Sequence, residues 1–485
     1  YLDNMLLPDL IVEAIEDAVS GTGFDLSANI LSLAGSIGGA GLAAGSAAVA
    51  DNDIENTVTA TIVDSAVTAT DGGIETLANS AAEIAAMTMG VGAAIGGALN
   101  ASITSNDIEN TVTAAATGAT TLDAKGAIKL AAEDASAIDS LAFSLAGAVG
   151  AALGAAVSDN TVNNTVKAYM QGSDTDMARI TGAGDVTIQA HSSADLNGLS
   201  TGASVGAVAA GATLASSTVT GEVDAFVGAH STTVDVDSLT VSAISDAKAA
   251  AQVTALYGGI VSGGYNHAQA TIAPKVAASV DQGAAVTASG AVAVSAQSHV
   301  AADAGATGVN VGLATAGMSK AETILAADVQ TTIAGTIVAG SLTASADNST
   351  LAGEEYAAKA TANGSTGSLF VGVDATRSTN VNTGKVLTTV ADDADVTVTT
   401  GDAGISAANN ISQSATADSA AGGLIAAGFA RATSSSNASV RVQVEDDASV
   451  VAEAGDVNID AQGLDDNFAV ATAGSGGLIA GAAAQ

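Results

Sequence analysis

The feature that most constrains this chain is a nine-residue segment that occurs twice without change. Asn52 to Ala60 has the sequence NDIENTVTA, and Asn106 to Ala114 repeats it 54 residues later. Weaker copies continue along the chain, and each carries a valine at the same point of the pattern. These valines are Val58, Val112, Val166, Val223, Val276, Val329, Val386 and Val440. Their spacings are 54, 54, 57, 53, 53, 57 and 54 residues, which is typical of repeat proteins whose units pack on their neighbours.

A second apolar position follows each valine, usually after a turn that contains glycine. It is occupied by Ile74, Ile128, Val186, Leu239, Val292, Leu342, Ile405 and Val457. Around most copies of both positions, apolar residues alternate with small or polar ones, which predicts strands with one buried face.

A third zone of small residues completes each unit. Examples are residues 87–102, 147–157 and 202–216, which consist of Ala, Gly, Ser and Thr with occasional larger aliphatic residues. Alanine favours a helix, but each glycine costs a helix about 1 kcal/mol relative to alanine. We therefore expect closely packed strands here rather than helices.

The composition indicates what such strands would bury. Hydrophobic residues make up 48% of the chain and aromatic residues only 2%, so alanine and valine carry the apolar character. The expected fold is all-β, a parallel β-solenoid (β-helix) of about eight repeats of roughly 54 residues with a small-residue core of Ala, Gly and Val. Because such a repeat is long for one rung of most β-helices, we expect about two or three rungs in each unit.

The two ends of the chain differ from the middle. Residues 1–20 break the pattern and place Leu10, Ile11, Ala14, Ile15 and Val19 at helical spacing, which indicates an atypical cap or insertion. Residues 21–485 are expected to form one continuous repeat array. The chain stops inside a copy of the third zone, so we expect it to be a section of a longer protein, truncated at both ends.

The charge restricts the possible partners. The formal net charge is −38, which argues against nucleic acid as a partner. No membrane-spanning segment is expected. No cofactor is expected either, apart from calcium, for which the candidate ligands are Asp51, Asp53, Glu55, Asp107 and Glu109 in two short loops. The alternative is that these loops use Asn and Asp to cap backbone groups.

Asparagines also recur in the repeat. Asn56, Asn110 and Asn164 lie 54 residues apart. If neighbouring units stack, these amides can form a ladder along the stack.

Motifs for catalysis are weak. The four histidines, His191, His230, His267 and His299, lie outside metal-binding spacings and are predicted to be solvated or stacked. Ser204 matches G-x-S-x-G within a small-residue zone, which we attribute to chance. The four arginines (Arg179, Arg377, Arg431 and Arg441) form no obvious cluster, and the acidic pairs at 392–393 and 446–447 lie in turn-like sequence. The chain is therefore not expected to be an enzyme.

The cadence of the repeat resembles a known family. Residues 165–190 and 285–296 (AVTASGAVAVSA) are similar to repeats of large bacterial surface exoproteins, the filamentous-haemagglutinin-like and autotransporter-like adhesins. The resemblance implies a right-handed parallel β-solenoid, secretion, and a role in attachment or surface structure. The chain departs from the family in lacking an Arg-Gly-Asp triplet and a secretion-domain motif.

The expected function is that of a structural or adhesive protein, extracellular or at the cell surface, forming a segment of a long fibre or adhesin stalk. Its expected partners are further copies of itself or other surface components. Two alternatives remain. One is a β-helix that binds or depolymerises polysaccharide, as phage tailspikes do. The other is a calcium-dependent extracellular matrix protein.

Overall fold

The computed structural model describes residues 28–182 and 184–485, and its elements there are all β-strands. The predicted cap at residues 1–20 lies outside the described residues. Among the residues that are described, no helix is long and apolar enough to cross a membrane.

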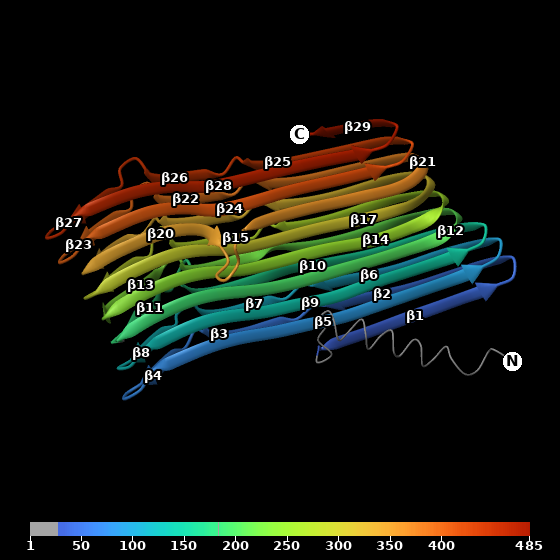
Figure 1. The fold of residues 1–485 in the computed structure, drawn as a ribbon. Coiled ribbons are helices and arrows are strands. Elements are labelled where there is room, and N and C mark those ends of the chain that lie inside the picture. Colours follow the sequence, from blue (N-terminus) through green and yellow to red (C-terminus); the bar gives the residue numbers. More distant parts are fainter. Residues whose placement is uncertain (1–27, 183) are drawn as a thin grey trace.

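Each repeat unit is one complete circuit of the chain. Strand β5 (Ile74–Ala94) runs outward, and the chain turns at Ile95 and Gly96. Strands β6 (Gly97–Ile108) and β7 (Thr111–Thr117) then run back, and β8 (Thr121–Ala124) crosses to the start of β9 (Ile128–Ala148), which lies on β5 (Figure 1). The prediction of about two or three rungs per unit was wrong. The 21-residue outward strand and the strands that return beside it together take up the whole repeat, so each unit makes one circuit.

The other strands repeat this circuit. They are β1 (Ile30–Ala40), β2 (Ala43–Ile54), β3 (Thr57–Val63), β4 (Ala66–Ala69), β10 (Ala151–Gln171), β11 (Ala178–Thr181), β12 (Asp185–Val227), β13 (Ser231–Val236), β14 (Ser238–Ile272), β15 (Lys275–Val280), β16 (Ala285–Ala288), β17 (Ala291–Leu325), β18 (Asp328–Ile333), β19 (Thr336–Ala339), β20 (Ser341–Thr350), β21 (Ala358–Asn382), β22 (Lys385–Val390), β23 (Asp395–Val398), β24 (Ala403–Gly422), β25 (Ile425–Ser436), β26 (Ser439–Val444), β27 (Ser449–Ala452), β28 (Val457–Gly476) and β29 (Ile479–Ala484). We number the units from 1, which begins with β1, to 9, which begins with β28.

Strands of successive units pair in parallel and in register. All eight anchor valines, from Val58 to Val440, are direct partners of one another from unit to unit, as the repeat predicts. The second set of anchors also aligns, with one exception. Ala403, not Ile405, is the partner of Leu342, and Ile405 lies two residues further along the same strand, where it pairs with Ala344.

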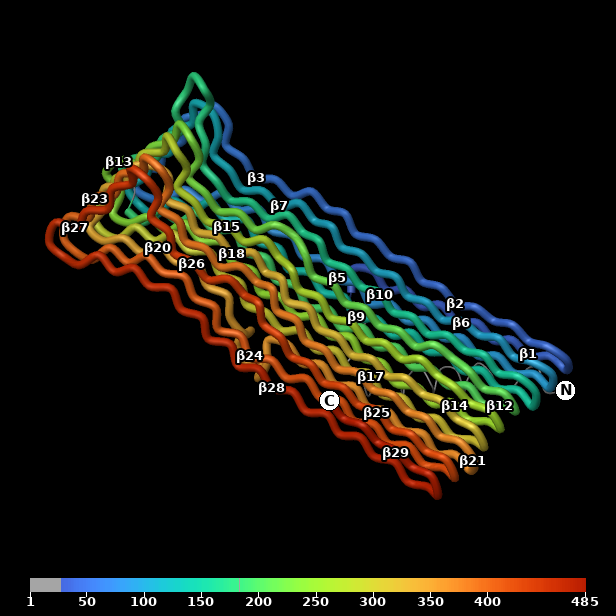
Figure 2. The backbone as a smooth tube through the Cα atoms, turned by 90° about the horizontal axis from the view of Figure 1, so that it is seen from above, coloured from blue at the N-terminus to red at the C-terminus, as the bar shows by residue number. Residues whose placement is uncertain are grey.

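The strands form two sheets. A 21-stranded sheet covers both long faces, because strands such as β12 and β14 continue around the bend between them, and an eight-stranded sheet of β4, β8, β11, β13, β16, β19, β23 and β27 closes one end. We call the face of β5 and β9 the outgoing face and the face of β6, β7 and β10 the return face. The end with the eight-stranded sheet is the wide end, and the end with the bend is the narrow end (Figure 2).

The core changes character between these ends. At the wide end, larger aliphatic side chains from all three sides, such as Val166, Ile180 and Ile188, are fully buried together. Toward the narrow end the buried side chains are mainly Ala, Ser, Thr and Asn. The small-residue zones are strands, as predicted from their glycine content.

One aromatic ring interrupts this small-residue interior. Tyr257 is the largest fully buried side chain, and its hydroxyl group lies 3.0 Å from Thr213 Oγ1. Gly211 and Gly264 leave the space for the ring, since a Cβ atom at Gly264 would lie 1.9 Å from a ring carbon. These two glycines are therefore required by packing.

Candidate functional site

The predicted calcium ligands lie mostly in strands rather than in loops. Asp51 and Asp53 belong to β2 and Asp107 to β6, while Glu55 and Glu109 follow the ends of these strands. All five side chains are exposed on the return face, where Asp53 is the direct partner of Asp107. Burial raises the pKa of Asp107, and the nearby carboxylates Asp53 and Glu109 raise it further.

The same segments form no compact metal site. Among the described residues, no three His, Asp or Glu side chains converge as metal ligands would. Calcium binding at these carboxylates therefore stays a prediction, which a rise in melting temperature on calcium titration would support.

The asparagines between these carboxylates face inward and have a structural role. Asn52 Nδ2 donates a hydrogen bond to Asn106 Oδ1 (2.7 Å), and Asn106 Nδ2 donates one to Asn160 Oδ1 (2.8 Å). This amide ladder was missed in the sequence, although equal spacing of 54 residues marks all three positions.

The predicted ladder of Asn56, Asn110 and Asn164 is also present, but it runs through the backbone. The backbone N–H of Asn110 donates to Asn164 Oδ1 (2.8 Å), and that of Asn56 donates to Asn110 Oδ1 (3.2 Å). The side-chain amides of Asn110 and Asn164 instead donate to the buried carboxylate of Asp134.

Two histidines converge on one carboxylate on the outgoing face. His191 Nε2 lies 2.9 Å from Asp246 Oδ2, and His299 Nδ1 lies 2.6 Å from Asp246 Oδ1. The hydrogen bond to Asp246 raises the pKa of His299, and both histidines hold the pKa of Asp246 well below its usual value. The histidines are 108 residues apart, two units of the repeat, so sequence spacing alone did not bring them together.

A charged hollow lies beside this cluster. Between β20 and β21, residues 351–357 form a loop over the outgoing face, and Lys248 Nζ lies 2.9 Å from Glu354 Oε1 in this loop. The space under the loop has a volume of about 640 Å³. We call it the charged recess. Its lining includes Asp139, Asp195, Asn197, Lys248, Asp303, Glu354, Glu355, Tyr356 and Lys359.

Two partly buried carboxyl groups, those of Asp195 and Asp303, line the charged recess close to lysine side chains. Burial raises the pKa of Asp195 and also that of Asp303. Lys248 and Lys359 act in the opposite direction, and Lys359 Nζ lies 3.9 Å from Asp303 Oδ2. Partly buried carboxyls, two ammonium groups and one tyrosine can bind hydroxyl-rich or cationic ligands through hydrogen bonds.

Other residues singled out in the sequence have structural positions. Ser204 is fully buried, faces inward and lies within β12, so it does not sit on the strand-to-helix turn that exposes a nucleophile. Asp393 and Asp447 have positive φ angles of 62° and 58° in tight turns, as their sequence context predicts. His230 also lies in a turn (φ 56°), whereas His267 lies within β14.

The arginines are less scattered than the sequence suggests. Arg377 and Arg431 are direct partners on neighbouring strands of the return face, and Lys320 precedes them in the same row. The prediction that the arginines form no cluster was therefore wrong for this pair, because register rather than sequence distance sets their separation.

Comparison of the chain with protein-family models, curated proteins and solved structures finds no match in any of the three.

Proposed function

We propose that this chain is a section of a parallel β-solenoid with a structural or adhesive role outside the cell or at its surface, without catalytic activity. The observation that supports this most is the parallel pairing of every unit with the next from unit 1 to unit 9, together with small side chains and amide ladders in the interior. Such a stack can be extended by adding further units in the same register, which suits a stalk or fibre. The resemblance to filamentous-haemagglutinin-like and autotransporter-like adhesins agrees with this role.

Immunogold labelling of the source cells tests the proposal directly. Antibodies raised against this chain should label surface filaments on intact cells, and mild external proteolysis should remove the label. Labelling only after the cells are broken open would contradict it. Deletion of the encoding segment should reduce attachment or filament length without loss of an enzymatic activity.

A second candidate, polysaccharide binding, is favoured by the charged recess. It combines the partly buried carboxyl groups of Asp195 and Asp303 with Tyr356 in one concave space. A glycan array would test this, with Asp303→Asn and Tyr356→Ala as variants that should lose the signal. Arg179, a cation outside the recess lining, offers Arg179→Ala as a control that should retain it.

A further inference from the structure

The outer surface of the narrow end has no polar residues over a wide area of the return face. Nine strand segments lie side by side there: β2, β6, β10, the later parts of β12, β14, β17 and β21, then β25 and β29. The three outward rows nearest the bend begin at Ala43, Gly45 and Ala47 in unit 1. Across all nine strands these rows contain only Gly, Ala, Val, Leu, Ile, Met, Phe and a single Tyr.

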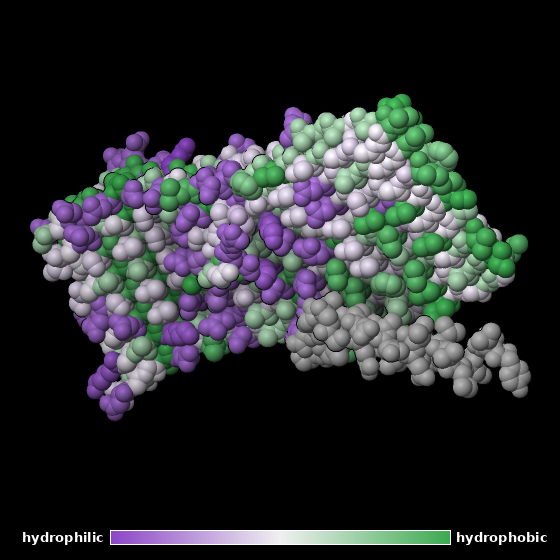
Figure 3. All heavy atoms as spheres, viewed as in Figure 1, coloured by the Kyte–Doolittle hydropathy of each residue, from purple (hydrophilic) through white to green (hydrophobic). Residues whose placement is uncertain are grey.

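Large members of these rows are substantially exposed. Leu99, Leu153, Val208, Val261 and Phe429 have exposed fractions of 57%, 42%, 48%, 49% and 49%. Figure 3 shows hydrophobic residues gathered along the narrow end, at the right-hand edge of the view, and hydrophilic residues toward the wide end. We call the three rows the apolar panel.

The panel is large enough for a stable protein interface. Strands repeat about every 4.8 Å and outward residues about every 6.6 Å, so nine strands and three rows cover roughly 850 Å². A standard interface buries about 800 Å² on each partner, whereas the largest apolar patch on a monomer is typically about 300–600 Å². The outgoing face is less uniform. Its two rows nearest the bend are apolar except for Ser365, but its third row carries polar side chains such as Thr201, Asn363 and Asp418.

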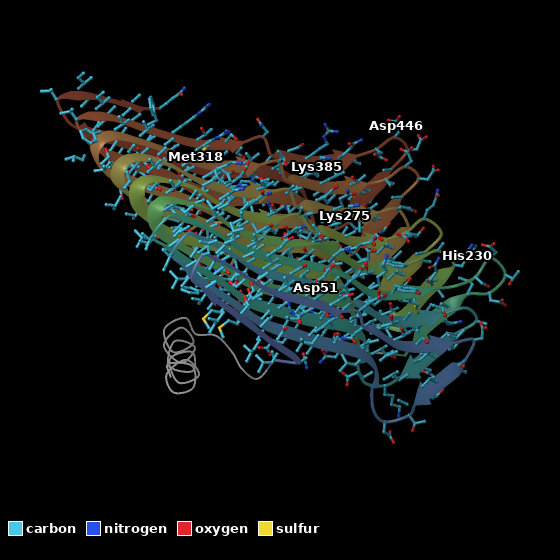
Figure 4. All side chains as sticks on the ribbon, turned by 90° about the vertical axis from the view of Figure 1, so that its right-hand side faces the viewer. Asp51, His230, Lys275, Met318, Lys385 and Asp446 are labelled. Atoms are coloured by element: carbon cyan, nitrogen blue, oxygen red, sulfur yellow. The ribbon has the colours of Figure 1, made fainter. Side chains whose placement is uncertain are left out.

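Charges beside the panel are separated along the stack. In units 1 to 3 the row next to the panel is apolar, Asp51 and Asp159 lie one row further out, and Asp53 and Asp107 lie two rows further out. In units 6 to 8 the row next to the panel holds Lys320, Arg377 and Arg431 instead. Figure 4 shows Asp51 in the lower units and Met318, a member of the panel, in the upper ones.

Most of these border charges lack an ion-pair partner within one copy, whereas Lys320 pairs with Glu322 of its own strand. Among the described residues, Asp51, Arg377 and Arg431 take part in no ion pair. The acidic and basic borders therefore remain available to an opposing surface.

We propose that the apolar panel binds the same panel of a second copy, with the two stacks antiparallel. A two-fold axis along the strand direction, between units 4 and 5, places unit 1 of one copy opposite unit 8 of the other and unit 3 opposite unit 6. Asp51 then lies across from Arg431 of the second copy, and Asp159 lies across from Lys320 of the second copy. In each pair the acidic residue is one row further from the bend than the basic residue. The equal strand spacing of the two copies lets their side-chain rows interdigitate along the whole panel.

This arrangement also reduces repulsion between two chains that each carry a formal charge of −38. Because the two-fold axis runs along the strands, both wide ends lie at the same end of the pair, and charge complementarity at the panel border offsets part of the repulsion and selects the antiparallel direction. In a parallel pair the two-fold axis would run along the stack and reverse the strand direction of one copy, so the charged borders of the two copies would lie on opposite sides of the panel and would not face each other.

Sedimentation equilibrium of the chain tests the proposal, with a dimer as the expected species. Leu153→Asp should abolish the dimer. The matched control is Leu145→Asp, because Leu145 has a similar exposed fraction (37% against 42%) but lies on the outgoing face. Circular dichroism of both variants should show that the β-structure is retained.

Charge reversal tests the direction of the pair. Asp51→Arg and Arg431→Asp should each raise the dimer dissociation constant at least tenfold, because like charges then face each other. The double variant should restore dimer formation, since both borders are exchanged at once. A chain that stays monomeric at 100 µM would overturn the proposal, and so would larger polymers, a double variant without rescue, or a monomer that binds zwitterionic lipid vesicles through the panel.

Discussion

The wide and narrow ends of the molecule are built from the same strands, yet they distribute polarity in opposite ways. Strand β10 contains both arrangements. Near its end, Val166 is fully buried and Lys167 faces solvent, whereas near its start Ser158 is buried and Leu153 is exposed. Strand alternation alone therefore does not decide which face is inward, since register with neighbouring units can hold a polar side chain inside.

The interiors of the two ends are stabilised differently. The wide end relies on burial of larger aliphatic side chains from the outgoing face, the return face and the eight-stranded sheet. The narrow end brings the outgoing and return faces close together through small residues and satisfies part of its interior by hydrogen bonds such as the Asn52–Asn106–Asn160 ladder. Mutations at the two ends should therefore change the free energy of unfolding by different mechanisms and by different amounts.

The largest effect is expected from truncation in the wide core. Ile180→Ala should lower the free energy of unfolding by about 3–4 kcal/mol, because it creates a cavity at a fully buried position. Leu153→Ala at the narrow end should change it by less than about 0.5 kcal/mol in the monomer. Urea unfolding curves measure both values, and equal losses would contradict the comparison.

An opposite sign is expected at Asp374, a carboxyl group buried in the narrow end. Its Oδ2 accepts a hydrogen bond from Ser419 Oγ (2.7 Å), and burial raises its pKa to about 6. Because the folded-state pKa lies above the unfolded value, this group destabilises the fold as pH rises from about 4 to above 6. Asp374→Asn should stabilise the protein by about 2–3 kcal/mol at pH 7.5 and by almost nothing at pH 4.

Unfolding at the two pH values checks this prediction. Exposed Asp418, on the outgoing face of the next unit, supplies Asp418→Asn as a control that should leave the pH dependence unchanged. A destabilised Asp374→Asn variant at pH 7.5 would show that the carboxylate is required in its ionised form.

A smaller loss is expected from the amide ladder. Asn106→Ala leaves Asn52 Nδ2 and Asn160 Oδ1 without their partners, which should cost about 1–2 kcal/mol. Ser105→Ala changes the neighbouring outward side chain and should cost under about 0.5 kcal/mol. If both variants unfold at the same urea concentration as the parent chain, the ladder contributes nothing to stability.

The smallest effect is expected at the histidine cluster on the surface. Its hydrogen bond to Asp246 raises the pKa of His299, so the pair stabilises the fold at low pH and loses this contribution as pH rises through the raised pKa. Asp246→Asn should lower the His299 pKa and change stability by less than about 1 kcal/mol, since both side chains are partly exposed. An unchanged titration of His299 by NMR would contradict the contact.

Much of the fold followed from the repeat itself. The eight valines and seven of the eight second anchors form columns along the stack. Equivalent residues of successive units pair directly, so a position that is buried in one unit is covered by its equivalent in the next. The number of rungs per unit could not be predicted in this way, because the alternation of apolar and polar residues indicates a strand but does not indicate where that strand bends. The Ile405 anchor failed because Ala403, a smaller apolar residue on the same face of the strand, fills the column position.

The candidate sites were harder to predict than the columns. Asp246 joins histidines from two other units, and the charged recess depends on the inserted loop at residues 351–357. The exposed panel was hidden because Leu153 and Val208 look like core residues in sequence. Only register shows that they face outward.

Cysteine accessibility in β10 tests the central contrast most directly, because the chain contains no cysteine of its own. Single cysteines at Leu153, Val157, Ser158 and Val166 would be treated with a maleimide at a concentration where the chain is monomeric. The account predicts fast labelling at positions 153 and 157, and protection at 158 and 166 until urea unfolds the chain. Fast labelling at 158 together with protection at 153 would contradict it, since the narrow end would then bury its apolar side chains as the wide end does.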